Sequence, residues 1–99
     1  SSGSSGDANT YIGYATGLNN TGNNNCIIGA FSGQNTSGDL NVFIGNNSGS
    51  NNTTGSRNTV IGNNAEVSGS GFINATAIGH RAEVGASNAM VLGSINGVN

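Results

Sequence analysis

Charged side chains are scarce in this sequence, and their scarcity excludes several classes of partner. The 99 residues include two Lys or Arg, which are Arg57 and Arg81, and four Asp or Glu, for a net charge of −2. Binding to a phosphate backbone or to an anionic membrane surface depends on clusters of Lys and Arg. Nucleic acid is therefore not an expected partner, and no direct membrane contact is expected from this segment.

Cysteines and long apolar runs are also few. Cys26 is the only cysteine, so no disulfide or multi-cysteine metal site can form within one chain, and a buried spectator thiol is the favoured interpretation. No run approaches the roughly 20 apolar residues of a membrane-spanning helix, and no secretory signal is seen. We therefore expect a fragment of a longer protein whose anchor lies outside this sequence.

The hydrophobic content is low for a folded domain of this length. Hydrophobic residues make up 33% of the chain and aromatic residues 5%, while glycine occurs 18 times. A single chain of this composition cannot bury the core that an ordinary domain of its size needs. An oligomer, or one piece of a longer rod, is expected instead.

A short motif, which reads NTVIG at 58–62, recurs along the chain. Its other copies are NTYIG at 9–13, NCIIG at 25–29, NVFIG at 41–45, ATAIG at 75–79 and AMVLG at 89–93. The closing glycines are Gly13, Gly29, Gly45, Gly62, Gly79 and Gly93, so the repeats step by 16, 16, 17, 17 and 14 residues. This near-constant period predicts an all-β solenoid in which each repeat forms one coil. Residues 1–6, SSGSSG, look like an expression linker and are set aside, which leaves a single domain at 7–99.

The rest of each repeat predicts a second extended segment between two turns. Gly and Asn are expected to supply the positive φ angles that these turns require. In the later repeats AEV, at 65–67 and 82–84, alternates apolar and polar residues, which predicts an outer strand with its charged side in solvent. Glu66 and Glu83 should then stack one coil apart, and Arg81 should form a surface ion pair with Glu83.

The strand within the NTVIG motif is apolar on both of its faces. One series is nearly constant and comprises Ile12, Ile28, Ile44, Ile61, Ile78 and Leu92. The other series varies in size and comprises Tyr11, Ile27, Phe43, Val60, Ala77 and Val91. Because strand side chains alternate, the two series lie on opposite faces, and one face should contact other chains in a homotrimer. We assign the constant series to the coil interior, since a coil of fixed cross-section favours a constant side chain, although the inverse assignment stays open.

Groups suited to catalysis are few and scattered. His80 occupies a turn position, and the carboxylates are Asp7, Asp39, Glu66 and Glu83. Catalysis needs complementary acid, base or nucleophilic groups in one concave site, and a metal site needs several ligands at suitable spacing. We therefore expect no enzyme activity, no catalytic residue, no cofactor and no metal.

An ice-binding solenoid is a disfavoured interpretation of the repeats, because a regular ladder of outward threonines is not evident.

The repeats resemble those of two protein families, each in a different part of the chain. The segment 74–94, NATAIGHRAEVGASNAMVLGS, resembles the head repeats of trimeric autotransporter adhesins of the YadA type, whose motif runs approximately Asn-Ser-Val-Ala-Ile-Gly-x-x-Ser or Ala. The residues on that motif are Asn74, Ala77, Ile78, Gly79, Ala82, Asn88, Leu92 and Gly93. The earlier repeats place their asparagine one residue later, at Asn9, Asn25, Asn41 and Asn58. In this they are similar to repeats of phage tail fibres and of other surface proteins that end in an endosialidase-type chaperone domain.

The resemblance implies a left-handed parallel β-roll of 14–17-residue coils in which three chains lie side by side. It also implies a cell-surface adhesion module on the outer membrane of a bacterium, acting in virulence and binding extracellular-matrix protein or glycan. The alternative is a rigid spacer segment of a virion tail fibre or other surface fibre. Binding, where it occurs, is expected to be shallow and repeated, on the outer strands and on the turns at 46–52 and 63–66.

Overall fold

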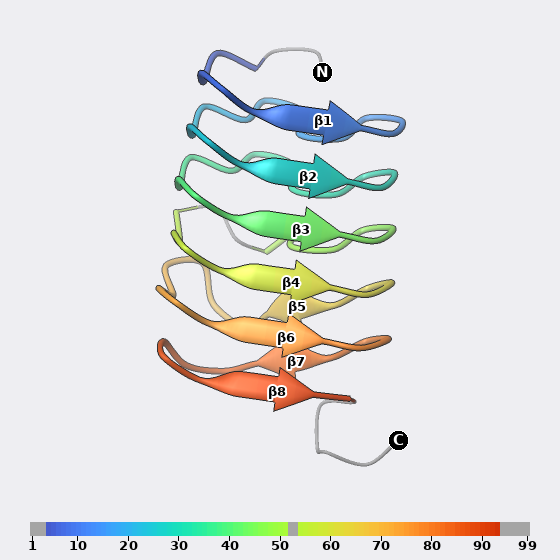
Figure 1. Cartoon of the computed structure of the whole chain (residues 1–99), viewed down its shortest axis with the longest axis vertical. Coiled ribbons are helices and arrows are strands. Elements are labelled where there is room, and N and C mark those ends of the chain that lie inside the picture. The colour runs from blue at the N-terminus through green and yellow to red at the C-terminus, as the bar shows by residue number, and fades with distance from the viewer. Residues whose placement is uncertain (1–3, 52–53, 94–99) are drawn as a thin grey trace.

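The computed structural model describes residues 4–51 and 54–93, which form a parallel β-solenoid without a helix (Figure 1). Its main sheet has six strands in the order β1-β2-β3-β4-β6-β8, and a smaller sheet pairs β5 with β7. The main strands are β1 (Thr10–Ile12), β2 (Cys26–Ile28), β3 (Val42–Ile44), β4 (Thr59–Ile61), β6 (Thr76–Ile78) and β8 (Met90–Leu92), and the smaller sheet holds β5 (Glu66–Val67) and β7 (Glu83–Val84). The predicted all-β solenoid is confirmed.

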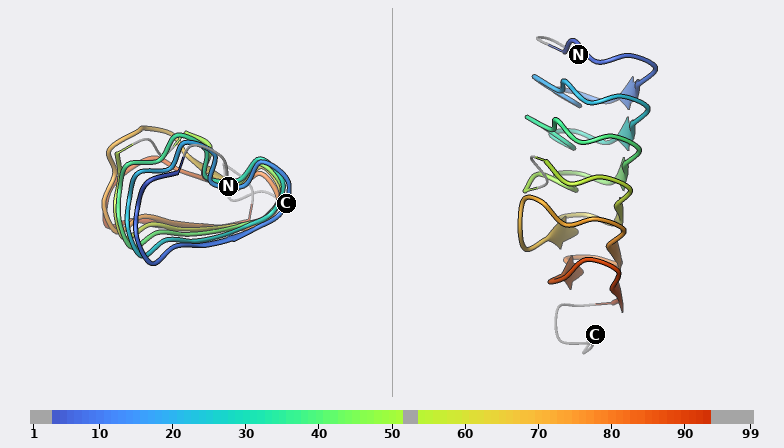
Figure 2. Two further views of the ribbon diagram at one scale, coloured as in Figure 1. Left: turned by 90° about the horizontal axis from the view of Figure 1, so that it is seen from above. Right: turned by 90° about the vertical axis from the view of Figure 1, so that its left-hand side faces the viewer.

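All strand pairs are parallel and in register from coil to coil. Ile12 pairs with Ile28, Ile28 with Ile44, and the series continues through Ile61 and Ile78 to Leu92. The chain runs along each front strand, returns behind it and descends by one coil, which makes the winding left-handed (Figures 1 and 2). Seen from above, the coils superpose as a flattened loop with one long straight side, and the main sheet forms that side (Figure 2).

The glycine after each main strand turns the chain away from the sheet. These six glycines have φ between +95° and +138°, a region that side chains rarely adopt. At Gly29 an added Cβ would also lie 2.4 Å from the carbonyl oxygen of Gly45 in the next coil. Glycine is therefore required here both by the backbone conformation and by the close approach of successive coils.

The coil interior contains the variable series, so the assignment of the constant series to the interior was wrong. Ile27, Phe43 and Val60 are fully buried inside the coils, whereas Ile12 and Leu92 are 57% and 62% exposed. The constant series lies on the outer face of the main sheet. This is the inverse assignment that the alternation of the strands left open.

The interior tolerates variable side chains because the return segment compensates for their size. Where the strand residue is large, the return segment carries glycine: an added Cβ at Gly49 would lie 2.5 Å from the Phe43 ring, and one at Gly17 would lie 2.3 Å from the Tyr11 ring. Where the strand residue is small, as at Ala77, the return segment contributes buried valines. These are Val67 and Val84, which join the same apolar cluster. The cross-section of the coil is thus kept by paired changes across it.

A ladder of asparagines fixes the other side of the coil interior. The side-chain oxygens of Asn9, Asn25 and Asn41 each accept a hydrogen bond from the backbone N–H of the next asparagine, at 2.8, 2.9 and 2.9 Å. The amide groups of Asn25 and Asn41 donate to the carbonyls of Gly38 and Gly55, at 3.0 and 2.9 Å. Asn58 continues the ladder to Ala75 N at 2.8 Å. Because buried amides must be satisfied, these bonds fix the register of successive coils.

The return segments differ from the two-strand prediction in the first three coils. Among the described residues, strand occurs in the return segments at β5 and β7, while the described parts of the β1, β2 and β3 returns run through turns. In the β1 coil the return contains positive φ angles at Ala15, Gly17 and Asn19, which prevent a continuous extended run. Glu66 and Glu83 occupy the repeat position that is glycine in these three coils, and the backbone there is an extended strand instead of a turn.

The assignment of residues 1–6 to a linker stays a prediction, and Ser5 in that segment donates from its backbone N to Asn20 O at 3.0 Å. Two further expectations need correction. Cys26 is half-buried on the outer face of the sheet rather than buried in the coil. The second correction concerns the predicted Arg81–Glu83 ion pair.

That ion pair does not form between these two described residues. Arg81 has a φ of 61°, so the strand alternation that would place both side chains on one face ends before Glu83. The stacking of Glu66 on Glu83 does occur, because β5 and β7 pair in that register. The described residues also contain no helix long and apolar enough to cross a membrane.

Candidate interaction surfaces

The outer face of the main sheet is a mostly apolar strip without charged residues. We call it the outer sheet face; its first row is Ile12, Ile28, Ile44, Ile61, Ile78 and Leu92, and its second row is Thr10, Cys26, Val42, Thr59, Thr76 and Met90. The exposed residues of the two rows are Thr10, Ile12, Ile78, Met90 and Leu92, and the other residues of the rows are half-buried by their neighbours.

Regular stacking makes this face long and continuous. The pairing places equivalent residues at the strand spacing of about 4.8 Å, so six strands extend over about 24 Å. Contiguous exposed apolar surface of this kind is typical of an interaction site. The structure therefore brings the predicted packing residues together in two sets, one inside the coil and one on the outer sheet face.

The turns that follow the main strands form a second surface, which we call the strand-end edge. Its first column is Tyr14, Ala30, Asn46, Asn63 and His80, and its second column is Ala15, Phe31, Asn47, Asn64 and Arg81. Backbone bonds connect the columns, for example Phe31 N to Tyr14 O at 3.0 Å and Asn64 N to Asn46 O at 2.9 Å. Every residue of the second column has a positive φ, between 54° and 61°. The backbone is thus uniform while the side chains change from coil to coil.

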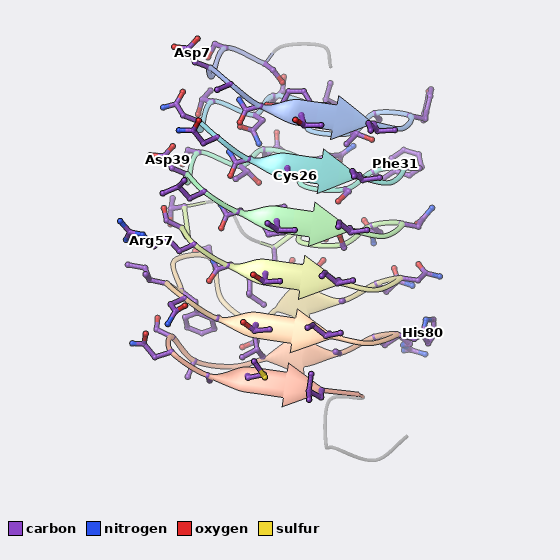
Figure 3. All side chains as sticks on the ribbon, in the orientation of Figure 1. Asp7, Cys26, Phe31, Asp39, Arg57 and His80 are labelled. Atoms are coloured by element: carbon purple, nitrogen blue, oxygen red, sulfur yellow. The ribbon has the colours of Figure 1, made fainter. Side chains whose placement is uncertain are left out.

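The side chains of the strand-end edge include an exposed aromatic pair. The rings of Tyr14 and Phe31 meet edge to face, with centroids 5.6 Å apart and planes at 79°. Further along the edge the amide of Asn47 donates to the side-chain oxygen of Asn64 at 3.3 Å. Phe31 and His80 lie on this same edge (Figure 3). The aromatic pair was not predicted from the sequence, although the repeat period does place Phe31 diagonally next to Tyr14.

The opposite edge carries Asp7, Asp39 and Arg57 (Figure 3). Here side chains accept hydrogen bonds from the backbone of the preceding coil: Asn23 N donates to Asp39 Oδ1 at 2.7 Å, and Asp7 N donates to Asn23 Oδ1 at 2.7 Å. These carboxylate and amide groups stabilise the turns. Like the asparagine ladder inside the coil, they connect successive coils by bonds from a backbone N–H to a side-chain oxygen.

Glu66 is the carboxylate whose environment differs most from water. It accepts hydrogen bonds from the backbone N–H groups of Ser50 and Asn51, both at 3.0 Å, and from the Ser50 hydroxyl. Burial raises the pKa of Glu66 above its ordinary value of 4.5, the hydrogen bonds oppose this rise, and the nearby Glu83 adds to it. Glu66 therefore connects the β3 coil to the β4 coil, and its pKa is raised mainly by burial.

The described residues do not bring catalytic groups into one site. His80 is exposed on the strand-end edge and Cys26 lies on the outer sheet face. Among the described residues, no group of three or more His, Cys, Asp or Glu side chains could hold a metal ion. Comparisons with protein-family models, with curated proteins and with solved structures found no match to this chain.

Proposed function

We propose that this solenoid is a non-catalytic adhesion module in a homotrimeric cell-surface fibre. The observation that carries the proposal is the outer sheet face, an uncharged apolar strip that a single chain leaves exposed at Ile12, Ile78 and Leu92. Burying such a strip between chains removes apolar area from water at about 25 cal/mol per Å². Three copies that meet along their outer sheet faces would compensate for the small core of each chain.

The adhesive surface would be the part of the coil that such an assembly leaves outside. The strand-end edge has a uniform backbone with side chains that differ between coils, from Tyr14 and Phe31 to His80 and Arg81. A rigid support of this kind with varied exposed residues suits recognition of extracellular-matrix protein or glycan. Three copies in one trimer would strengthen shallow binding through effective concentration.

A spacer role is the second candidate, and the continuous hydrogen-bond ladders favour it. The asparagine ladder runs from Asn9 to Asn58 inside the coil, and turn bonds run along the edge opposite the strand ends. Such ladders stiffen a rod whether or not its surface binds a ligand. The fibre would stand on a bacterial outer membrane or, in the alternative, on a virion tail.

A binding screen separates the two candidates. The chain would be assayed against collagens, fibronectin, laminin and a glycan array, beside a variant in which the residues of the strand-end edge are shuffled among the coils. Adhesion predicts saturable binding to at least one ligand and its loss in the shuffled variant. Absence of binding, or equal binding by both chains, would leave the spacer role in place of adhesion.

A further inference from the structure

We infer that the strand-end edge binds a linear glycan that contains a uronic acid. The inference rests on the proposed adhesive function, because it names the ligand class of that surface. Along this edge the side chains change in order, with an aromatic pair on the first two coils, amides on the next two and His80 with Arg81 on the fifth. Four coil steps of about 4.8 Å span about 19 Å, which suits an extended oligosaccharide.

The aromatic end of the edge is exposed, and the positive φ angle of Phe31 disfavours a bulky side chain at that position. Phe31 has a φ of 60° and a side chain that is 44% exposed, and Tyr14 is 77% exposed. A bulky residue at positive φ is uncommon and costs free energy, and Asn47 and Asn64 show that asparagine fits the same position. Phe31 therefore serves neither the backbone nor the coil interior. Its edge-to-face contact with Tyr14 instead holds an aromatic surface against which the C–H face of a sugar ring can pack.

The middle of the edge offers hydrogen-bonding groups for sugar hydroxyls. Asn46, Asn47, Asn63 and Asn64 are all exposed. The bond from Asn47 to Asn64 uses one N–H of Asn47 and the side-chain oxygen of Asn64. An amide carries two N–H donors and an oxygen that accepts. This bond leaves the N–H donors of Asn64 and the side-chain oxygen of Asn47 unused, on two exposed residues.

The cationic end of the edge fits one carboxylate. Arg81 is exposed and forms no ion pair among the described residues, and its guanidinium fork matches a carboxylate in a bidentate manner. The remaining arginine, Arg57, lies on the opposite edge with Asp7 and Asp39 (Figure 3). One arginine per edge suits a glycan with isolated carboxylates, whereas a densely sulfated chain needs several cations. The order of the groups thus favours a uronic acid next to neutral sugars.

Titration calorimetry on the full chain tests this inference. The probe is a hexasaccharide of alternating glucuronic acid and N-acetylglucosamine; a hexasaccharide of N-acetylglucosamine alone and a heparin hexasaccharide serve as the neutral and sulfated comparisons. The variants are Phe31→Asn and Arg81→Asn, which install the residue found at the same positive-φ position in the β3 and β4 coils. Arg57→Asn is the matched control, because it removes the same charge at a φ of 58° on the opposite edge.

The expected pattern distinguishes the two ends of the edge. Phe31→Asn should lower the affinity for both the uronic acid and the neutral hexasaccharide about tenfold, as for a central contact residue. Arg81→Asn should lower the affinity for the uronic acid hexasaccharide about tenfold and leave the neutral one unchanged. Arg57→Asn should change neither, and circular dichroism should show all three variants folded.

Three results would overturn the inference. They are no saturable binding of the uronic acid hexasaccharide, an equal loss in Arg57→Asn, or tighter binding of the heparin hexasaccharide than of the uronic acid one. Its failure is distinguishable from failure of the proposed function. A chain that binds a matrix protein in the screen but no hexasaccharide refutes the glycan assignment alone, whereas a chain that binds nothing refutes adhesion as well.

Discussion

Asn41 shows how single polar side chains hold the coils in register. It is fully buried, its side-chain oxygen accepts from Asn58 N at 2.9 Å, and its amide donates to Gly55 O at 2.9 Å. Asn41→Ala removes both bonds and should lower the free energy of unfolding by about 2 to 4 kcal/mol. Urea unfolding at a fixed protein concentration measures the loss.

The control for Asn41 is an asparagine outside the ladder. Asn46 is exposed on the strand-end edge, so Asn46→Ala should change the free energy of unfolding by less than about 0.5 kcal/mol. Similar losses in the two variants would mean that the ladder does not stabilise the fold.

Glu66 makes the stability of the solenoid depend on pH. Its pKa is raised, mainly by burial, so between 4.5 and the higher folded value the folded chain binds more protons than the unfolded chain. The contribution of Glu66 to stability is therefore complete below pH 4.5 and is lost as the pH rises through the folded pKa. Glu66→Gln should flatten this part of the profile of unfolding free energy against pH.

Glu83→Gln separates the two causes of the raised pKa. Removing the neighbouring carboxylate should lower the pKa of Glu66, and the pH at which stability is lost should move down with it. NMR titration of the Glu66 side chain follows the pKa directly. If the profile of unfolding free energy against pH is the same in Glu66→Gln as in the unmodified chain, another group causes the pH dependence.

At the scale of elements, each main strand and its return segment form a matched pair. Gly49 has a φ of +67°, and an added Cβ would lie 2.5 Å from the Phe43 ring. Gly49→Ala should cost about 2 to 4 kcal/mol, from overpacking together with the left-handed backbone. In a Phe43→Val background the overpacking is relieved, and a double-mutant cycle should show a coupling of about 1 to 3 kcal/mol. Additive losses would contradict the matching.

The sequence predicted the repeat architecture of the fold but not the match between each strand and its return segment. The period of the glycines and the in-register strands followed from the NTVIG motif, because hydrogen bonding between coils repeats with the chain. Which strand face points inward did not follow, since both series are apolar. The compensation appears only when Phe43 is compared with Gly49, or Ala77 with Val84, across the coil.

The surfaces were only partly predictable for a related reason. The sequence predicted the outward-facing turns. It also grouped the residues of the outer sheet face on one side of the strand, but it assigned that side to the coil interior. The contact of Tyr14 with Phe31 depends on the positive φ of Phe31, a conformation that residue preferences do not suggest. The ion pair predicted from alternation at Arg81 and Glu83 was wrong because of the same conformation at Arg81.

At the scale of the whole molecule, we propose that the outer sheet face determines assembly. Ile61 is half-buried within one chain and lies in the middle of that face. Ile61→Asp should leave the coil interior intact but weaken association at least tenfold, since a charge at the centre of an apolar interface loses its hydration. Light scattering over a dilution series measures the effect, and Asn63→Asp, an equal charge change on the strand-end edge, serves as the control.

The proposed assembly depends on the burial of the outer sheet face between copies of this chain. Sedimentation equilibrium of the unmodified chain at micromolar concentration tests this directly. A trimer predicts a single species with three times the mass of the 9.7 kDa chain, and unfolding on dilution below the association range. A well-folded species with the mass of one chain at that concentration would contradict it.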